Sequence, residues 1–162
     1  AHTNVGFSVK HMMITNVTGK FNDVSGNFEY DEKTNTLKAL SGDIIVASIN
    51  TADEKRDTHL KAEELFDAAK FPKINFNATK IEENAVYGDL TMKGITKNIK
   101  LELENGGTVT DPWGKQRAGF ELVGKINRKD FGITWNKVLE TGGVAVGEEI
   151  KLQIAMEGIL AK

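Results

Sequence analysis

Hydrophobic and polar residues alternate along most of this chain with a period of two, as they do in β-strands that bury one face. In residues 5–11 the alternation places Phe7, Val9 and His11 on one face and the polar residues between them on the other. Comparable segments recur at short, even spacing, around residues 17–30, 37–50, 74–78, 86–92, 95–103, 118–126, 131–135 and 150–158. We count roughly eight strands, and this pattern predicts an all-β fold, either an antiparallel sandwich or a barrel.

One stretch, residues 51–70, has the spacing of a helix instead. An apolar stripe at i, i+3, i+4 and i+7 runs along it, formed by Ala62, Leu65, Phe66 and Ala69. Thr51 and Glu54 have the spacing of a capping box at its start, and Pro72 must end it. Because the stripe needs an apolar partner, we expect this helical segment to cover one end of an eight-stranded barrel.

Turn signals separate the later strands. Asn105-Gly106-Gly107 predicts a tight hairpin connection, because these residues tolerate positive φ. Asp111-Pro112-Trp113-Gly114 has proline and glycine where a type I turn prefers them. The glycine pair Gly142-Gly143, with residues 146–148, is expected to form the last connection.

Small residues occupy apolar positions of several strands where bulky side chains are expected. They are Gly19, Ala78, Gly88, Ala118, Gly124 and Gly158. The missing bulk either leaves unfilled volume inside the barrel or relieves bending at barrel corners, and the sequence leaves both interpretations open. A barrel of this size fills with side chains or holds one small ligand, and the small residues favour the ligand.

Length and charge narrow the functional classes. The 162 residues form one domain, residues 1–162, and the absence of cysteine excludes disulfides and thiolate chemistry. Lys and Arg number 21 against 23 for Asp and Glu, so the composition gives no general attraction to nucleic acid or to an anionic membrane surface. The longest apolar run, residues 44–49, is too short to span a bilayer.

The most enzyme-like cluster is Arg56, Asp57 and His59. Adjacent helical residues diverge by about 100°, so Asp57 does not share a face with His59, and we favour a structural role at the barrel rim. His11 is expected to be a hydrogen-bonded core residue. The three histidines lack metal-ligand spacing, which predicts no metal site.

Two further groups have both a structural and a binding interpretation. Residues 127–130, Asn-Arg-Lys-Asp, could bind an anion, but asparagine and aspartate at the ends of a turn are ordinary turn chemistry. Trp113 and Trp135 could stack on a ligand or fill the core, and we expect Trp113 to cover an apolar opening.

Longer motifs extend over nearly the whole chain. They include Val5-x-Phe7-x-Val9-x-His11, Arg56-Asp57-x-His59-Leu60, Phe71-Pro72-x-Ile74-x-Phe76, Gly88-Asp89-Leu90-Thr91-Met92-Lys93-Gly94, Asn127-Arg128-x-Asp130-Phe131-Gly132-Ile133-x-Trp135 and Val146-Gly147-Glu148-Glu149-Ile150. Together these motifs resemble the YceI family of lipocalin-like barrels that bind polyisoprenoid lipids. The sequence departs from the family at Asn98, where the family usually has proline.

The resemblance implies a barrel with a lipid channel, a helix over one end, no established catalytic residues, no cofactor and, often, a homodimer. Residues 139–144 resemble the cytoplasmic branch of the family, so we expect a cytoplasmic location. The alternative is a periplasmic protein whose signal peptide has been removed.

Alternation and resemblance together predict the residues that bind the lipid. They are Phe7, Val9, His11, Val17, Phe21, Phe28, Ile44, Val46, Leu60, Phe66, Phe71, Phe76, Leu90, Met92, Phe120, Leu122, Phe131, Ile133 and Trp135. A cavity of this composition holds almost no charge, so its ligand must be mostly hydrocarbon, with any charged head group at the mouth.

The leading hypothesis is a non-catalytic carrier of a long-chain isoprenoid, such as a polyprenyl diphosphate or a quinone. A binder of fatty acids or fatty amides is an alternative from the same class. A lipid-modifying hydrolase would use His59 with Asp57 or Asp130. The remaining alternative is a stress protein whose barrel only supports contacts with partners. We expect neither nucleic-acid binding nor stable membrane insertion.

Overall fold

The computed structural model describes residues 3–136 and 146–159. Its strands are β1 (Asn4–His11), β2 (Thr15–Phe21), β3 (Val24–Asp31), β4 (Thr36–Ile45), β5 (Ile49–Asn50), β6 (Lys73–Ile81), β7 (Ala85–Met92), β8 (Ile95–Thr110), β9 (Gln116–Asn127) and β10 (Val146–Ile159). The helical elements are α1 (Glu54–Leu60) and two 3₁₀ turns, η1 (Val46–Ser48) and η2 (Arg128–Phe131). The expected connection at Gly142-Gly143 lies outside the described residues, and residues 146–148 belong to β10.

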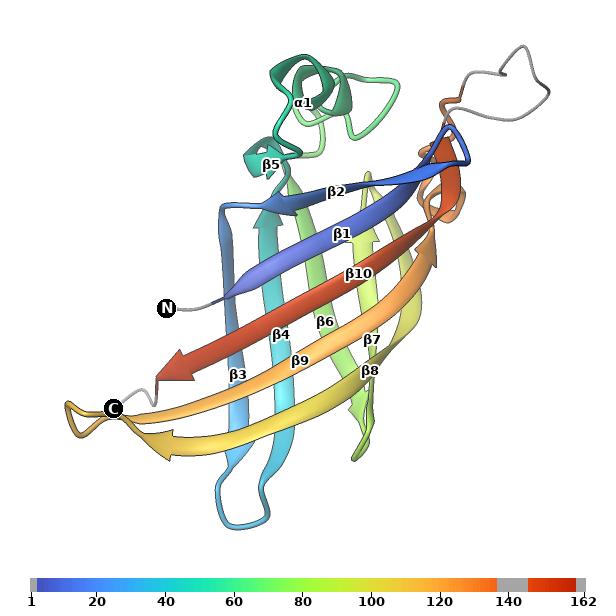
Figure 1. Cartoon of the computed structure of the whole chain (residues 1–162). Coiled ribbons are helices and arrows are strands. Elements are labelled where there is room, and N and C mark those ends of the chain that lie inside the picture. Colours follow the sequence, from blue (N-terminus) through green and yellow to red (C-terminus); the bar gives the residue numbers. More distant parts are fainter. Residues whose placement is uncertain (1–2, 137–145, 160–162) are drawn as a thin grey trace.

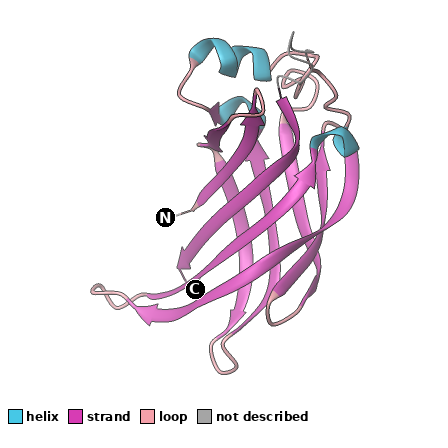
Figure 2. Ribbon diagram, turned by 45° about the vertical axis from the view of Figure 1, so that its right-hand side comes forward, coloured by secondary structure: helices cyan, strands magenta, loops and turns pink. Residues whose placement is uncertain are grey.

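The strands form one antiparallel sheet in the order β3-β4-β6-β7-β8-β9-β10-β1-β2-β5. The sheet curls around a long interior, and α1 lies across one end (Figures 1 and 2). This arrangement confirms the predicted lipocalin-like, all-β fold. The sheet has ten strands where roughly eight were expected, since the segments 17–30 and 37–50 each give two strands while 131–135 gives none.

Both interruptions occur at one corner of the barrel. Residues 22–23 separate β2 from β3, and η1 separates β4 from β5. Two backbone hydrogen bonds hold this corner, from Asn22 N to Ser48 O at 3.1 Å and from Ile45 N to Asp23 O at 3.0 Å. These bonds pair backbone groups that a sharp turn would otherwise leave without partners. Because of the bend, β2 and β3 belong to two different parts of the sheet.

The predicted helix over residues 51–70 is much shorter in the structure. Only α1, Glu54–Leu60, is α-helical, and residues 61–70 form turns. The capping residue is Asp53, whose carboxylate accepts a bond from Arg56 N, and not the expected Thr51. Leu65 is nevertheless buried, with Phe66 packed edge-on against Phe21. Packing of these side chains on the barrel therefore overrides the helical propensity of the alanine-rich segment.

Two other local predictions are wrong for identifiable reasons. The expected hairpin at Asn105-Gly106-Gly107 is a β-bulge within β8, where the register shifts against β9 and Gly107 has a φ of +84°. The segment 131–135 is not a strand, because η2 turns the chain and residues 132–136 cross the rim. The turn at Asp111–Gly114 is confirmed by a bond from Gly114 N to Asp111 O at 3.0 Å.

The core divides into two clusters along the barrel. The cluster farther from α1 consists of Leu37, Leu40, Val86, Leu101, Leu103, Phe120 and Leu122. The cluster nearer α1 includes Phe21, Ile49, Leu65, Met92 and Phe131. Side chains therefore fill the end of the barrel opposite α1.

Neighbouring rings fill the space beside three strand glycines, Gly19, Gly88 and Gly158, which neither sequence interpretation anticipated. Phe7 lies directly opposite Gly19, and its Cζ is 2.5 Å from the place of a Cβ on that glycine. The Phe76 ring covers Gly88 in the same way. A large aromatic beside a glycine fills the volume of two ordinary strand residues, so these glycines add no cavity.

We expect Gly88→Ala to destabilise the protein by about 1–3 kcal/mol, because its methyl group would meet the Phe76 ring and also Asn77 O, at 2.7 Å. Gly6→Ala is the matched control, since the nearest atoms lie at ordinary contact distance, 3.6 Å. Urea titrations of the two variants provide the measurement. Equal stabilities would show that Phe76 does not occupy this space.

Candidate functional site

A cavity of about 570 Å³ lies between the curled sheet and α1. Its walls are almost entirely apolar, and they include most of the residues predicted to bind lipid. These are Phe7, Val9, His11, Val17, Phe21, Ile44, Leu60, Phe66, Phe76, Leu90, Met92, Ile133 and Trp135. A volume of this size falls in the range of ordinary ligand pockets.

Six predicted residues lie away from the cavity. Phe28 and Phe120 pack edge to face at 5.1 Å between ring centroids, and Leu122 is buried beside Phe120. Val46 and Phe131 are buried in the core, and Phe71 covers Gly94. Alternation identifies the face on which a residue lies but not its depth along the barrel. It therefore grouped residues that fill the closed end with residues that line the cavity.

The prediction also missed part of the wall. The missed apolar residues are Val5, Met12, Leu65, Ile74, Ile99, Leu101, Ile126, Val146, Ile150, Leu152 and Ile154. The alternation of β9 and β10 would have found several of them, since Ile126 shares its phase with Phe120 and Leu122. The remaining missed residues are Gly6 and the polar or charged residues Lys10, Thr51, Lys55, Arg56 and Arg128, and no periodic signal marks them.

The polar lining residues are concentrated at the α1 end. Lys10 and His11 come from the end of β1, and Lys55, Arg56 and His59 come from α1. Among the lining residues that the structure describes, every side chain with a fixed charge is a cation. The cavity therefore joins an apolar interior to a mouth with positive charge.

Thr51 links α1 to the end of β5. Its N–H and hydroxyl donate to Asp57 Oδ1 at 3.0 and 2.6 Å. Arg56 donates from Nε to the Thr51 hydroxyl at 2.8 Å and from its guanidinium to Thr51 O at 2.7 Å. Because Thr51 is buried, these bonds fix both the helix and the Arg56 guanidinium at the edge of the cavity.

His59 does not form the pair with Asp57 that the hydrolase alternative requires. It pairs with Glu64, and its ring stands edge-on to the Trp135 ring at 4.8 Å between centroids. The Asp57 carboxylate instead accepts hydrogen bonds from Thr51. Within residues 3–136 and 146–159 no bond joins His59 to Asp130. His59 therefore lies in the wall at the cavity mouth, where α1 meets the rim segment 132–136.

Arg128 holds that rim segment in place. Its guanidinium donates to the carbonyl oxygens of Ile133 and Trp135 at 2.8 Å, Val146 at 3.3 Å and Gly147 at 2.7 Å. Burial lowers the pKa of Arg128. Because the ordinary pKa of arginine is very high, the guanidinium nevertheless stays charged. A buried cation satisfied by carbonyl dipoles thus positions Ile133 and Trp135 against the cavity.

The other candidate groups do not form a second chemical site. The Asn127 side chain accepts from Lys129 N, which is the predicted turn chemistry. Trp113 is 77% exposed and does not cover an apolar opening as expected. In the described part of the chain, no cluster of three histidine or acidic side chains could hold a metal ion.

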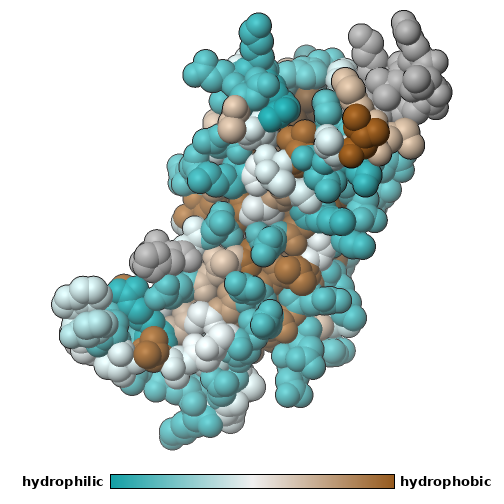
Figure 3. All heavy atoms as spheres, in the orientation of Figure 1, coloured by the Kyte–Doolittle hydropathy of each residue, from teal (hydrophilic) through white to brown (hydrophobic). Residues whose placement is uncertain are grey.

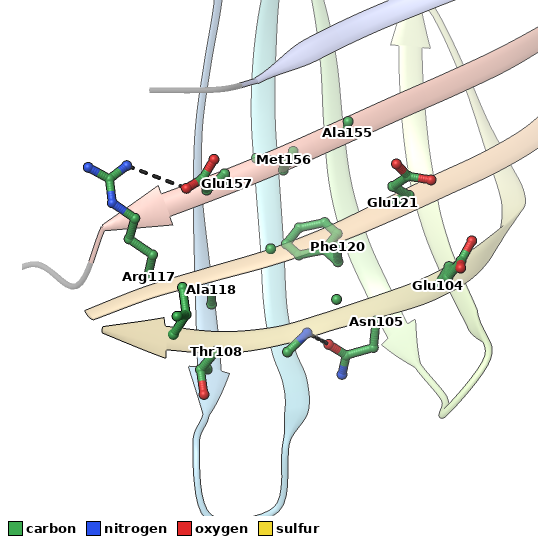
Figure 4. Close-up of a pocket in the computed structure, with 14 residues that line it drawn as sticks. Glu104, Asn105, Thr108, Arg117, Ala118, Phe120, Glu121, Ala155, Met156 and Glu157 are labelled. Atoms are coloured by element: carbon green, nitrogen blue, oxygen red, sulfur yellow. Dashed lines mark hydrogen bonds and ion pairs between the residues drawn. The ribbon is translucent and has the colours of Figure 1, made fainter. Parts of the chain in front are cut away.

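A surface hollow at the far end contains several charged side chains (Figure 4). Arg117 bonds Asp111 at 2.8 Å and Glu157 at 3.5 Å. The first of these bonds is the main reason that the pKa of Asp111 is lowered from its ordinary value. The network joins β9, β10 and the Asp111 turn, and we interpret it as structural.

A curled antiparallel sheet around an apolar cavity defines a lipocalin-like barrel of the ligand-holding kind. Residues 1–158 match the family model described as a YceI-like domain, and the chain belongs to the YceI family. A UPF0312 protein of Staphylococcus aureus is 41% identical over 159 residues, covering 97% of this chain and 92% of that protein.

Solved structures share the fold. The YCEI protein of Campylobacter jejuni is 34% identical, with a TM-score of 0.79 over 94% of this chain and 90% of that one. BcnA of Burkholderia cenocepacia has a TM-score of 0.80 at 20% identity, over 96% of each chain. A polyisoprenoid binding domain from Saccharophagus degradans has a TM-score of 0.72 at 13% identity, over 99% of this chain and 94% of that one.

We expect Arg128→Met to lower the free energy of unfolding by at least about 3 kcal/mol, because several partly buried carbonyls would lose their donor. Lys129→Met is the control, since its exposed ion pair with Glu148 is worth about 1 kcal/mol or less. Chemical denaturation compares the two. A loss for Arg128→Met no larger than for Lys129→Met would contradict this role.

Proposed function

We propose that this protein is a non-catalytic carrier that holds a long-chain isoprenoid lipid, of the polyprenyl diphosphate or quinone type, in its interior. The observation that carries the proposal is the apolar cavity of about 570 Å³ with charged residues gathered at its mouth. Membership of the YceI family supports a lipid-binding role. The Saccharophagus degradans domain, named for polyisoprenoid binding, has the same fold.

The composition of the wall determines the ligand's chemistry. A polar group placed deep in the cavity would lose its hydration without gaining partners, so the buried part must be hydrocarbon. At about 0.8 kcal/mol per buried methylene, ten carbons contribute on the order of 8 kcal/mol before the costs of binding. A longer chain contributes proportionally more, so we expect such a lipid to stay bound through purification.

The mouth favours an anionic or polar head group. Lys55 and Arg56 lie on α1 and Lys10 on β1, so cations from two elements border the cavity. Thr51 already holds the Arg56 guanidinium in place, which reduces the entropy lost when it binds an anion. A diphosphate gains most from these cations, and the carboxylate of a fatty acid is the alternative head group.

We expect purified protein to release a stoichiometric long-chain lipid on solvent extraction, and mass spectrometry identifies it. An isoprenoid supports the full proposal, whereas a fatty acid or fatty amide keeps the carrier role and replaces the ligand. Protein from several expression hosts without any lipid would contradict the carrier role, provided that added polyprenyl compounds also leave Trp135 fluorescence and the melting temperature unchanged.

A blocked cavity supplies a second test. Val9→Trp adds a large ring to the cavity wall, and we expect it to remove most of the co-purified lipid. Ser8→Trp is the matched control, since Ser8 is the neighbouring residue on the opposite face of β1. Lipid content per protein is measured after extraction. Equal lipid in both variants would place the ligand outside this cavity.

A further inference from the structure

The turn between β1 and β2 carries three consecutive exposed apolar side chains. Met12 is 45% exposed, Met13 58% and Ile14 81%. Hydrophobic atoms gather on the surface over this turn, at the same end of the molecule as α1 (Figures 1 and 3). Met12 also lines the cavity, so the exposed patch, which we call the apolar tip, is continuous with the cavity mouth.

Of the three side chains only Met12 lines the cavity, and the turn holds Met13 and Ile14 outside it. Met12 and Met13 have φ values of +48° and +65°, a conformation that glycine or asparagine adopts more easily than methionine. Large apolar residues at such positions cost stability, and Met13, with 58% of its surface exposed, gains little compensating burial within the chain. An apolar partner outside the chain would supply that burial.

We propose that the apolar tip inserts into the surface of a lipid bilayer and brings the cavity mouth to it. This inference rests on the proposed carrier function, because a hydrocarbon cargo must leave a bilayer to enter the cavity. A convex tip of three side chains is too small for a stable protein interface, which needs about 800 Å² on each partner. A few apolar side chains with cations beside them suit reversible attachment to a membrane.

The charge at the tip fits an anionic bilayer. Residues 10–16 contain Lys10 and no acidic residue. Since the whole chain carries a net charge of −2, long-range attraction is weak and attachment depends on the tip itself. No helix in the described residues is long and apolar enough to cross a membrane.

Vesicle flotation tests the attachment. We expect the full chain to float with vesicles of phosphatidylcholine mixed with phosphatidylglycerol, and less with phosphatidylcholine alone. Replacing the tip by Met13→Asn with Ile14→Thr should reduce flotation at least about tenfold, because two inserted apolar side chains are lost. These exposed, uncharged replacements leave Met12 and the cavity intact, and asparagine tolerates the positive φ at its position.

The control variant is Val109→Asn with Trp113→Gln at the far end of the barrel, where the side chains are 62% and 77% exposed. It should float like the unmodified protein. Transfer of bound lipid to vesicles should slow at least about tenfold in the tip variant only, with unchanged lipid content before mixing. Equal flotation and equal transfer rates for the two variants would overturn the proposal.

The two proposals fail in different ways. Protein that carries lipid but does not float, and whose tip variant transfers lipid at the unmodified rate, refutes the apolar tip and leaves the carrier role. Protein that floats through the tip but neither contains nor binds lipid refutes the carrier role and leaves membrane attachment.

Discussion

The structure depends on an uneven filling of the barrel interior. The strands turn an apolar face inward, and their side chains fill the end opposite α1 but leave a cavity at the α1 end. Away from α1, Phe28, Phe120 and Leu122 interlock, and rings beside glycines use the remaining space. At the α1 end an apolar cavity of about 570 Å³ remains. Close packing at one end thus supports an opening at the other.

The opening is held by polar interactions that the sheet itself cannot supply. Thr51 ties α1 to the corner of the barrel through Asp57 and Arg56. Arg128 ties the rim segment 132–136 to the start of β10. In both cases a guanidinium lies beside the apolar cavity, and oxygen atoms of the protein accept its hydrogen bonds. The positive charge at the mouth is therefore a product of how the rim is built.

The sequence predicted the fold better than it predicted the site. Strand alternation and turn residues were sufficient for the curled antiparallel sheet, because the period of two is a local signal. The position of a residue along the barrel axis is not a local signal. Alternation therefore could not separate Phe120 and Leu122 from Phe76 and Leu90, which also face the interior. The segment 61–70 has helical spacing, yet burial of Leu65 and Phe66 on the barrel prevents the helix from continuing. The hydrogen bonds from Arg128 to the carbonyls of Trp135 and Gly147 could not be predicted from composition or from residue spacing.

The pairing of β1 with β10 has a consequence for how the molecule folds. Asn4 lies opposite Ala155 and Phe7 opposite Leu152, so the seam of the barrel joins residues from the two extremes of the sequence. Contacts between such remote segments form slowly, because a long loop must close first. The interior remains open to its surroundings until the residues of β10 have been synthesised. During translation the nascent chain therefore exposes, on one side, the hydrocarbon surface that later becomes the inner wall.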